Sequence, residues 1–406
     1  MMHRAVHNDR SPVPARDPVA RAEALQALVR EHADQAERER CLPQSVAEAF
    51  AESGLYRIAA PGWCGGESAD PLTQFRAIEI IAEADGSAGW NLMIGIETFG
   101  LVAPGMATCA ELIDDPGVIM CSSTAAVGRA DAAPGGYRVS GQWQFVSGCQ
   151  NSRVFGATVR LFEDGEPVAD ANTLYAMIPH GEFSIVDTWN VSGLRGSGSH
   201  DVRVDDVMVP HARMVAAMGP GVKPQPPSGK EEAIRREAFQ RFPLGPRLAY
   251  NKVAVALGIA RAGITAFTDL AAGKVPRFSR ISLRERNRAQ RAVVEAELRA
   301  LGARTLVLDQ LAALWDDILA RRRVPARRLA LFQAACSDAV AGACTAVDQL
   351  SDAAGTTANM IGHPLERLGR DVRVVRQHVT VASHHIDDAG RVLLGVPAEE
   401  AMLRGL

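Results

Sequence analysis

Hydrophobic residues recur three or four positions apart from about residue 19 to about residue 110, as in ALQALV, SVAEAFAESGL and FRAIEIIAEADG. This spacing places them on one face of a helix and predicts an α-helical first block. From about residue 118 the pattern changes to short apolar runs broken by Gly and Pro, such as VIMCSS, YRVSGQWQFVSG and TLYAMIP, which is typical of strands. Long amphipathic segments return from Leu248 onward and predict a helix bundle.

The order of these patterns predicts an α+β fold. We expect a disordered tail at 1–17, an N-terminal helical domain at 18–115, a middle β-barrel or β-sandwich domain at 116–218, a connector at 219–240 and a C-terminal helical bundle at 241–406. The sequence contains neither a GxGxxG nor a P-loop motif. A doubly wound nucleotide-binding fold is therefore disfavoured.

The composition limits the partners and the compartment that we expect. The chain carries a formal net charge of -3, which argues against electrostatic binding of nucleic acid or a membrane surface. No apolar run approaches membrane-spanning length, and the first residues lack the apolar core of a signal sequence. The seven cysteines show no CxxC spacing, so we expect free thiols in the cytoplasm, with no disulfide framework and no metal site.

A polar loop followed by a strand stands near the middle of the chain, from Trp189 to Pro210. Residues Ser192 to Ser199 contain three glycines, three serines and one arginine, and valines then alternate with acidic residues up to Val209. Glycines let another molecule approach the backbone, and serines supply hydrogen-bond donors without bulk. The loop by itself fits a cofactor site and a tight surface turn equally well.

Three segments in this order, GYRVSGQWQFVSGCQNS, TWNVSGLRGSGSHDVRVDDVMVP and PLERLGRDVRVVRQH, resemble the flavin-dependent two-component monooxygenases of the acyl-CoA dehydrogenase superfamily. That branch includes the oxygenase components that hydroxylate 4-hydroxyphenylacetate. The resemblance extends from about Leu25 to about Gly395. It implies the acyl-CoA dehydrogenase fold, with a C-terminal four-helix bundle that serves as the interface of a homotetramer.

The superfamily contains dehydrogenases and oxygenases, and the residues distinguish them. The dehydrogenases use a glutamate as a base, and its two usual places fall near Val379 and Asn251 of this chain. Neither residue can remove a proton, so dehydrogenation lacks its general base. The oxygenases tend to carry a histidine eight residues after the arginine of the RD pair Arg370-Asp371, and His378 stands there.

The resemblance implies that His378 and Ser147 are the catalytic residues. Reduced flavin would react with oxygen to form a C4a-hydroperoxyflavin, and an imidazole beside it donates to, or takes a proton from, the peroxide because its pKa lies near neutrality. Without the family context, His378 is more simply a helix histidine satisfied by a neighbour. His384 and His385 adjoin Asp387 and Asp388, and a polar helix end is their simplest explanation.

The resemblance also implies a set of binding residues. The expected flavin-binding residues are Trp143, Phe145, Val146, Ser147, Arg195, Ser197, Ser199 and, for the phosphate across a subunit boundary, Arg277. The strand pattern places Trp143, Phe145 and Ser147 on one side of a strand. The expected substrate-pocket residues are Trp90, Asn91, Glu97 and Cys121. Phenol-hydroxylating relatives commonly have a histidine where this chain has the segment with Glu97.

We therefore expect an oxygenase component that takes reduced flavin from a separate reductase, because the chain has no nicotinamide-binding motif. FMN is the first choice of flavin, and FAD is the alternative. The first choice of reaction is hydroxylation of an aromatic or polyketide-like small molecule, and the alternative is N-oxidation of an amine by the same flavin chemistry. Two rivals stay open, an acyl-CoA dehydrogenase with Glu97 as a relocated base and a non-catalytic binding protein of the same fold.

Overall fold

The computed structural model describes residues 17–168, 174–216 and 230–396. The α-helices are α1 (Pro18–Glu39), α2 (Gln44–Glu52), α3 (Pro71–Ala84), α4 (Gly86–Val102), α5 (Lys230–Arg241), α6 (Leu244–Gly273), α7 (Asn287–Leu319), α8 (Ala326–Ala354), α9 (Pro364–Arg376) and α10 (His384–Leu393). The strands are β1 (Met120–Ala133), β2 (Gly136–Val146), β3 (Val154–Glu163), β4 (Glu166–Pro167), β5 (Leu174–Pro179), β6 (Ser184–Val186), β7 (His200–Pro210) and β8 (Met214–Ala216). The tail expected at 1–17 lies outside the described residues except for Asp17, which caps α1.

Helices α1 to α4 form the N-terminal domain, and aspartates set two of the helix boundaries. Asp70 begins α3 by accepting hydrogen bonds from the backbone N–H groups of Leu72 and Thr73 at 2.9 and 3.0 Å. Asp85 ends α3 and caps α4, accepting from the N–H of Ala88 at 2.8 Å. Helix α4 therefore starts directly after α3, and most of its residues are buried.

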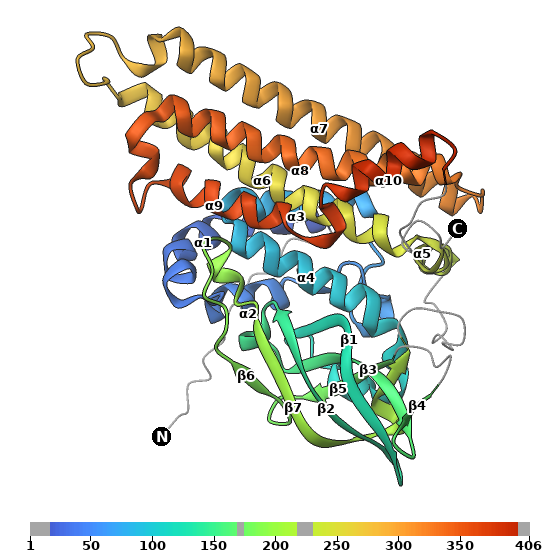
Figure 1. Ribbon diagram of the computed structural model, residues 1–406. Helices are drawn as coiled ribbons and strands as arrows, with labels where there is room; N and C mark the ends of the chain where they lie inside the picture. The colour runs from blue at the N-terminus through green and yellow to red at the C-terminus, as the bar shows by residue number, and fades with distance from the viewer. Residues whose placement is uncertain (1–16, 169–173, 217–229, 397–406) are drawn as a thin grey trace, which may run out of the picture.

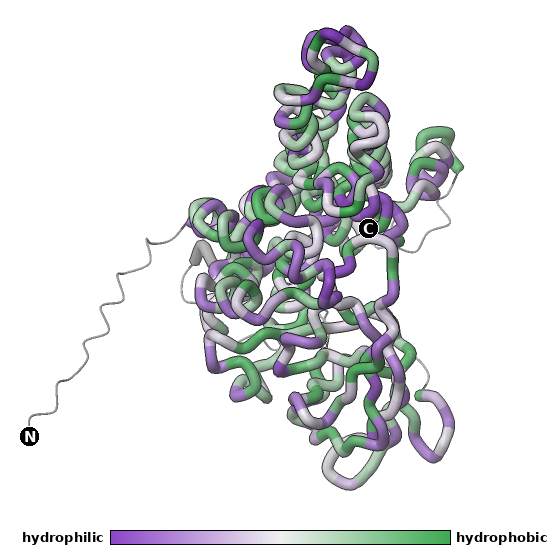
Figure 2. Tube along the Cα trace, turned by 90° about the vertical axis from the view of Figure 1, so that its left-hand side faces the viewer, coloured by the Kyte–Doolittle hydropathy of each residue, from purple (hydrophilic) through white to green (hydrophobic). Residues whose placement is uncertain are grey.

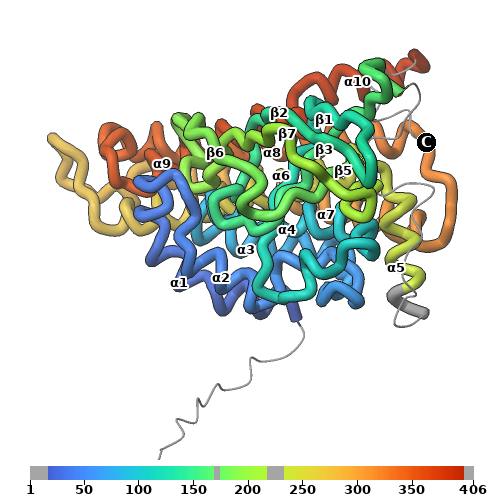
Figure 3. Tube along the Cα trace, turned by 90° about the horizontal axis from the view of Figure 1, so that it is seen from below, coloured from blue at the N-terminus to red at the C-terminus, as the bar shows by residue number. Residues whose placement is uncertain are grey.

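Within the described residues, the strands form one eight-stranded sheet in the order β6-β7-β2-β1-β3-β5-β8, with β4 paired to β3. Seen from below, the strands lie side by side from β6, on the side of α9, to β5, on the side of α5 (Figure 3). Strands β1 and β3 are parallel, whereas β1 pairs with β2 in the antiparallel direction. Trp143 of β2 meets Phe155 of β3 edge to face in the core of this domain. The middle β domain is confirmed in this form.

The long helices α6, α7 and α8 form the C-terminal bundle with the shorter α9 and α10, on the opposite side of the N-terminal helices from the sheet (Figure 1). Hydrophobic and hydrophilic residues alternate along these helices, as the amphipathic sequences predict (Figure 2). Helix α6 also packs on α3, where a Cβ atom on Gly258 would lie 2.5 Å from the carbonyl oxygen of Glu79. The bundle and the N-terminal domain thus share one continuous core.

Of the connector expected at 219–240, residues 219–229 lie outside the described residues, and helix α5 occupies Lys230–Arg241. This helix is strongly polar and lacks the periodic pattern of the other helices. It is anchored by aromatic contact, since the ring of Phe239 lies 4.7 Å from that of Trp315 on α7. The position of α5 therefore depends on its contact with α7, because the local sequence pattern of α5 is weak.

The expectation that no apolar run approaches membrane-spanning length is wrong. Among the described residues, Gly86–Leu112, Leu244–Gly273 and Ala326–Asn359 are helical segments long and apolar enough to cross a membrane by length and composition. In each segment at least 61% of the most apolar window is buried inside the protein. The packing of α4, α6 and α8 at the centre of the fold therefore explains why these segments are apolar.

Candidate active site

The Gly/Ser loop is held against the bundle by a carboxylate of α9. Leu194 has a left-handed backbone with φ of 50°, and its N–H donates to Oδ1 of Asp371 at 2.6 Å. Gly193 lies so close to α9 that a Cβ atom would fall 2.4 Å from the carbonyl oxygen of Arg370. A side chain at this position would push the loop away, so glycine is required by the close approach. The Asp371 contact is the anchor of the loop.

Arg195 holds the same loop to α1. Its Nε donates to the carbonyl of Glu37 at 3.2 Å, and its Nη1 donates to the carbonyl of Val191 at 3.1 Å. Arg370 reaches the same region, since its Nη1 donates to the carboxylate of Glu37 at 2.9 Å. The described contacts of Arg195 are therefore with protein groups of the loop and of α1, and its expected contact with flavin stays a prediction.

Three serine hydroxyls and an indole form a buried hydrogen-bonded chain. Trp90 of α4 donates from Nε1 to Oγ of Ser147 at 3.0 Å. The hydroxyl of Ser147 lies 2.7 Å from that of Ser199, which lies 2.8 Å from that of Ser197. All four side chains are buried. The structure thus brings together residues that the sequence placed in two separate sets, one for flavin and one for substrate.

His378 stands at the end of this chain, against the indole of Trp90. The two rings meet edge to face with centroids 5.5 Å apart. The backbone N–H of Thr380 donates to Nδ1 of His378 at 3.3 Å, and the Thr380 hydroxyl lies 2.9 Å from the same nitrogen. Nδ1 is therefore an acceptor, and the neutral ring carries its proton on Nε2.

The near-neutral pKa expected for His378 is wrong. Burial, and secondly the positive charge of Lys252, lower the pKa of His378 to about 3. The imidazole is therefore neutral at physiological pH, and it does not exchange a proton near neutrality as its ordinary pKa suggested. The neutral ring has one N–H, on Nε2, that can donate a hydrogen bond.

Glu97 does not lie in the structure as a free base. The ammonium group of Lys252 on α6 donates to both carboxylate oxygens of Glu97 at 2.6 Å, and Nδ2 of Asn251 donates to Oε1 at 3.0 Å. The side chains of Lys252 and Glu97 are 1% and 9% exposed. Burial lowers the pKa of Lys252, whereas the carboxylate of Glu97 raises it. The relocated base of the dehydrogenase rival is thus occupied in an ion pair.

The expected alternation of Trp143, Phe145 and Ser147 along one face of β2 is wrong. The register of β2 on β7 shifts between Trp143 and Val146, and Phe145 adopts φ of 59°. Trp143 and Val146 consequently point into the core of the β domain, while Phe145 is 69% exposed. The side chains of Trp143 and Val146 are therefore unavailable to a flavin, and only Phe145 presents an aromatic face.

Three further expected site residues, Cys121, Asn91 and Arg277, contact other parts of the protein. Cys121 is fully buried in the β domain, and burial raises the pKa of its thiol to about 12, so its place in a substrate pocket stays a prediction. Asn91 donates to the backbone carbonyls of Gly196 and Ser197 at 3.3 and 3.2 Å and so supports the loop. Arg277 is exposed beyond the C-terminal end of α6 and stacks on Phe278 at 4.9 Å. A role for Arg277 across a subunit boundary stays a prediction.

The residues around the serine chain fit a planar, hydrogen-bonding cofactor such as flavin. Phe145 presents an exposed ring, edge to face with Trp189 at 6.2 Å, on a strained backbone that the register shift imposes. Two residues further on, Ser147 supplies a hydroxyl beside Ser199. The neutral imidazole of His378 meets the Trp90 indole edge to face. An aromatic wall and several fixed donors are the features that such a ring requires.

The three-domain order of helices, sheet and bundle, with this site at the junction, defines an oxidoreductase fold of the flavoprotein type. Family models for the N-terminal and C-terminal domains of acyl-CoA dehydrogenase match residues 19–107 and 250–383. The chain belongs to the acyl-CoA dehydrogenase superfamily.

Several characterised proteins are similar to this chain over nearly its whole length. Indole-3-acetate monooxygenase of Pseudomonas putida is 29% identical over 92% of this chain and 93% of its own. The FADH(2)-dependent resorcinol hydroxylase oxygenase component of Rhizobium sp. is 28% identical over 89% of this chain and 90% of its own. The crystal structure of 3-HSA hydroxylase from Rhodococcus sp. RHA1 superposes with a TM-score of 0.82 and 26% identity, covering 96% of this chain and all of the other.

Reasoning from the sequence missed two residues of the site, Lys252 and Thr380. Thr380 follows His378 by two residues, and this spacing alone carries no chemical signal. Lys252 offered one, because it is a charged residue inside the long apolar segment from Leu248 to Ile259. A charge that must be buried there requires a partner, but the sequence did not show that this partner is Glu97.

Loss of the Lys252 charge tests the buried ion pair. We expect Lys252→Met to lower the free energy of unfolding by about 3–5 kcal/mol, because it leaves Glu97 buried without its partner. The double variant Lys252→Met with Glu97→Gln should recover part of this loss. Arg203→Ala is the matched control, since its partner Asp205 is exposed, and we expect it to cost less than about 1 kcal/mol. Urea denaturation measures each value, and equal losses for Lys252→Met and Arg203→Ala would contradict the assignment.

The anchor of the loop should make stability depend on pH. Burial, and then the nearby carboxylate of Asp85, raise the pKa of Asp371 from 3.8 to about 7, against the opposing effects of the Leu194 N–H and Arg367. The folded protein therefore takes up a proton that the unfolded chain does not bind until lower pH. We expect the free energy of unfolding of the wild type to rise, relative to Asp371→Asn, as pH falls through about 7, with a slope approaching about 1.4 kcal/mol per pH unit.

Denaturation at several pH values measures this slope. Asp387→Asn, at an exposed position of α10, is the control and should keep the pH dependence of the wild type. If Asp371→Asn and wild type show parallel curves, the carboxylate of Asp371 does not titrate as described.

Proposed function

We propose that this protein is the oxygenase component of a two-component flavin-dependent monooxygenase that hydroxylates an aromatic or polyketide-like small molecule. The observation that carries this function is the absence of a free base at the places where dehydrogenases need one. Asn251 is an amide, Val379 is apolar, and Glu97 is held by Lys252. The relatives are named as monooxygenases or hydroxylases, including two that act on indole-3-acetate and resorcinol.

The residues present define what the protein contributes to such a reaction. Reduced flavin, when bound, activates molecular oxygen. Ser147 and Ser199 would hold its polar edge, and Phe145 would cover a ring face. His378 donates through Nε2 from a fixed orientation and stays neutral, so it stabilises developing negative charge without itself titrating. Trp90 and the buried surroundings exclude water, which would divert oxygen to hydrogen peroxide.

The flavin is expected to arrive from another protein. Several relatives are named as oxygenase components, and such names imply a separate reductase. FMN and FAD both suit the described donors, and FMN is our first choice. A direct test adds the purified protein to a flavin reductase, NADH and either flavin with aromatic substrates, and looks for product with one added oxygen atom by mass spectrometry.

The outcome of that assay separates the rivals. Hydroxylated product that requires both reductase and this protein supports the proposal. Reduction of bound FAD by an acyl-CoA, without reductase and without hydroxylated product, would establish a dehydrogenase instead. Flavin binding without either reaction would leave a non-catalytic protein of the same fold.

Replacement of His378 tests its proposed role as a neutral donor. We expect His378→Ala to lower the product formed per oxygen consumed by a factor of about two to ten, because one hydrogen bond is lost. His378→Gln places an amide N–H near the position of Nε2 and should restore part of the ratio. Gln377→Ala, an exposed neighbour, should leave the ratio unchanged. An unchanged ratio in His378→Ala would remove His378 from the mechanism.

Association of four chains through the bundle is part of the proposal. On α7, Val294, Leu298 and Leu301 are 57%, 64% and 57% exposed, and their spacing places them on one face. Apolar residues gathered in this way usually mark a surface that another protein covers. A second copy of the bundle is the partner that suits a face of this kind in a homo-oligomer.

We expect Leu298→Glu combined with Leu301→Glu to convert the tetramer to a smaller species, because two charges would be buried in the contact. Size-exclusion chromatography with light scattering measures the mass. Leu394→Glu introduces the same change at a residue that is 84% exposed outside α7 and should leave the mass as in the wild type. A double variant that keeps the wild-type mass places the interface elsewhere.

A further inference from the structure

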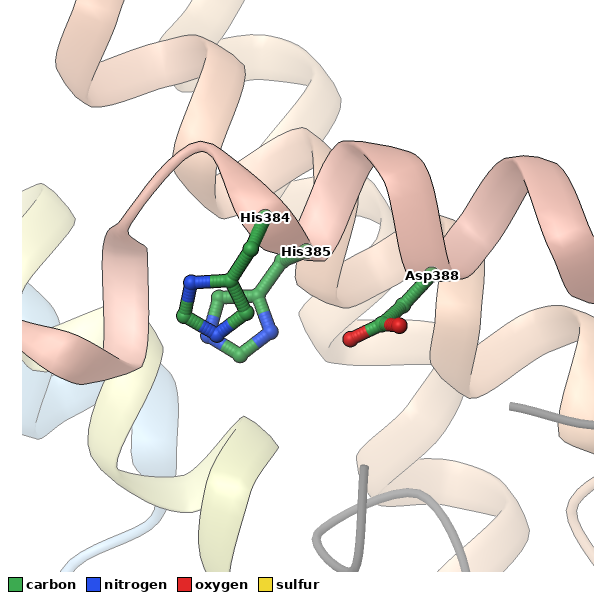
Figure 4. A group of neighbouring side chains, drawn as sticks. All are labelled: His384, His385 and Asp388. Atoms are coloured by element: carbon green, nitrogen blue, oxygen red, sulfur yellow. The ribbon is translucent and has the colours of Figure 1, made fainter. Parts of the chain in front are cut away.

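Two histidines and an aspartate meet at the beginning of α10. His384, His385 and Asp388 each offer one ligand atom, and these atoms lie within 4.8 Å of one another. Figure 4 shows the two imidazole rings one behind the other, with the carboxylate of Asp388 turned toward them. The spacing i, i+4 from His384 to Asp388 and i, i+3 from His385 to Asp388 brings all three to one side of the helix. The polar helix end expected from the sequence is therefore an organised cluster.

The orientation of His385 is fixed by a hydrogen bond on its far nitrogen. Nε2 lies 2.8 Å from the carbonyl oxygen of Val379. A carbonyl accepts only, so Nε2 must carry the proton and Nδ1 of the neutral ring presents a lone pair. Metal-binding histidines commonly donate their second nitrogen to a carbonyl in this way, which sets the tautomer and the direction of the ligand atom.

Two residues of the cluster are buried, and the third is exposed to solvent. His385 and Asp388 are 1% and 9% exposed, whereas His384 is exposed to solvent. The rings of His384 and His385 lie 4.1 Å apart at a tilt of 40°. Two buried ligands therefore keep their geometry, and an ion could enter from the side of His384. Solvent would complete the coordination there, as in sites with three protein ligands.

We propose that His384, His385 and Asp388 bind a divalent transition-metal ion of the zinc class. Two imidazoles and one carboxylate suit Zn²⁺ or Co²⁺, whereas Mg²⁺ prefers a shell of oxygen atoms. The positive end of the α10 dipole opposes a cation, and the negative charges of Asp388 and its neighbour Asp387 offset this effect. The bound ion also holds His385, and through the carbonyl of Val379 it stabilises the turn that carries His378.

The first experiment titrates the full-length, untagged protein with Co²⁺ and Zn²⁺, followed by calorimetry and by the visible absorption of Co²⁺. We expect one ion per chain, and no comparable binding of Mg²⁺. His384→Ala removes an exposed ligand, and Asp388→Asn removes the carboxylate. Each should weaken binding by about tenfold or more, because fewer ligands remain.

Two control variants distinguish this cluster from other surface groups. Asp387→Asn removes the same charge from the same helix, and His211→Ala removes a histidine from the β domain. Both should bind as the wild type does, and circular dichroism checks that every variant is folded. Binding that is unchanged in His384→Ala and in Asp388→Asn, or the absence of binding to the wild type, would overturn the proposal.

Hydrogen exchange tests the connection to His378. Zn²⁺ should slow amide exchange in residues 379–385 of the wild type and have no such effect in Asp388→Asn. This measurement needs no flavin and no activity, so it stands apart from the proposed monooxygenase function. Zinc binding without slower exchange would overturn the connection between the cluster and the turn.

Discussion

The hydrogen bond from the N–H of Leu194 to the buried carboxylate of Asp371 joins two segments that are 177 residues apart in the chain. It fixes the Gly/Ser loop against α9, and the loop in turn sets the positions of Ser197 and Ser199. Ser147 and Trp90 depend on those hydroxyls through the buried chain of hydrogen bonds. The site is therefore assembled at the meeting point of all three domains, and it exists only when they are packed together.

Buried charge decides which chemistry this fold can support. A fold of this family becomes a dehydrogenase when a carboxylate stands free beside the substrate. Here the carboxylate of Glu97 is bound on both oxygens by Lys252, and the amide of Asn251 holds it further. Burial, and secondly the same ammonium group, lower the pKa of His378 and keep the imidazole neutral. The ion pair thus occupies the carboxylate that a dehydrogenase would need as a free base.

The segment from α9 to α10 connects three features that the sequence presents as separate. Arg370 and Asp371 hold the loop, His378 faces Trp90, and His385 contacts the carbonyl of Val379. A cation at the start of α10 would therefore act on the turn that carries His378. This arrangement gives the bundle a means to influence the site beyond simple support.

The sequence by itself determined the order of helices, sheet and bundle, because apolar periodicity is a local property that reports which face of each element is buried. The three motifs also indicated the family, which the family models confirm. Only the tertiary structure decided the surroundings of the site residues. The register shift in β2 separated Trp143 from Phe145, and the packing of α4 on α6 paired Glu97 with Lys252. Burial, and with it the charge state of His378, depends on atoms brought together from distant parts of the chain, and no local pattern records them.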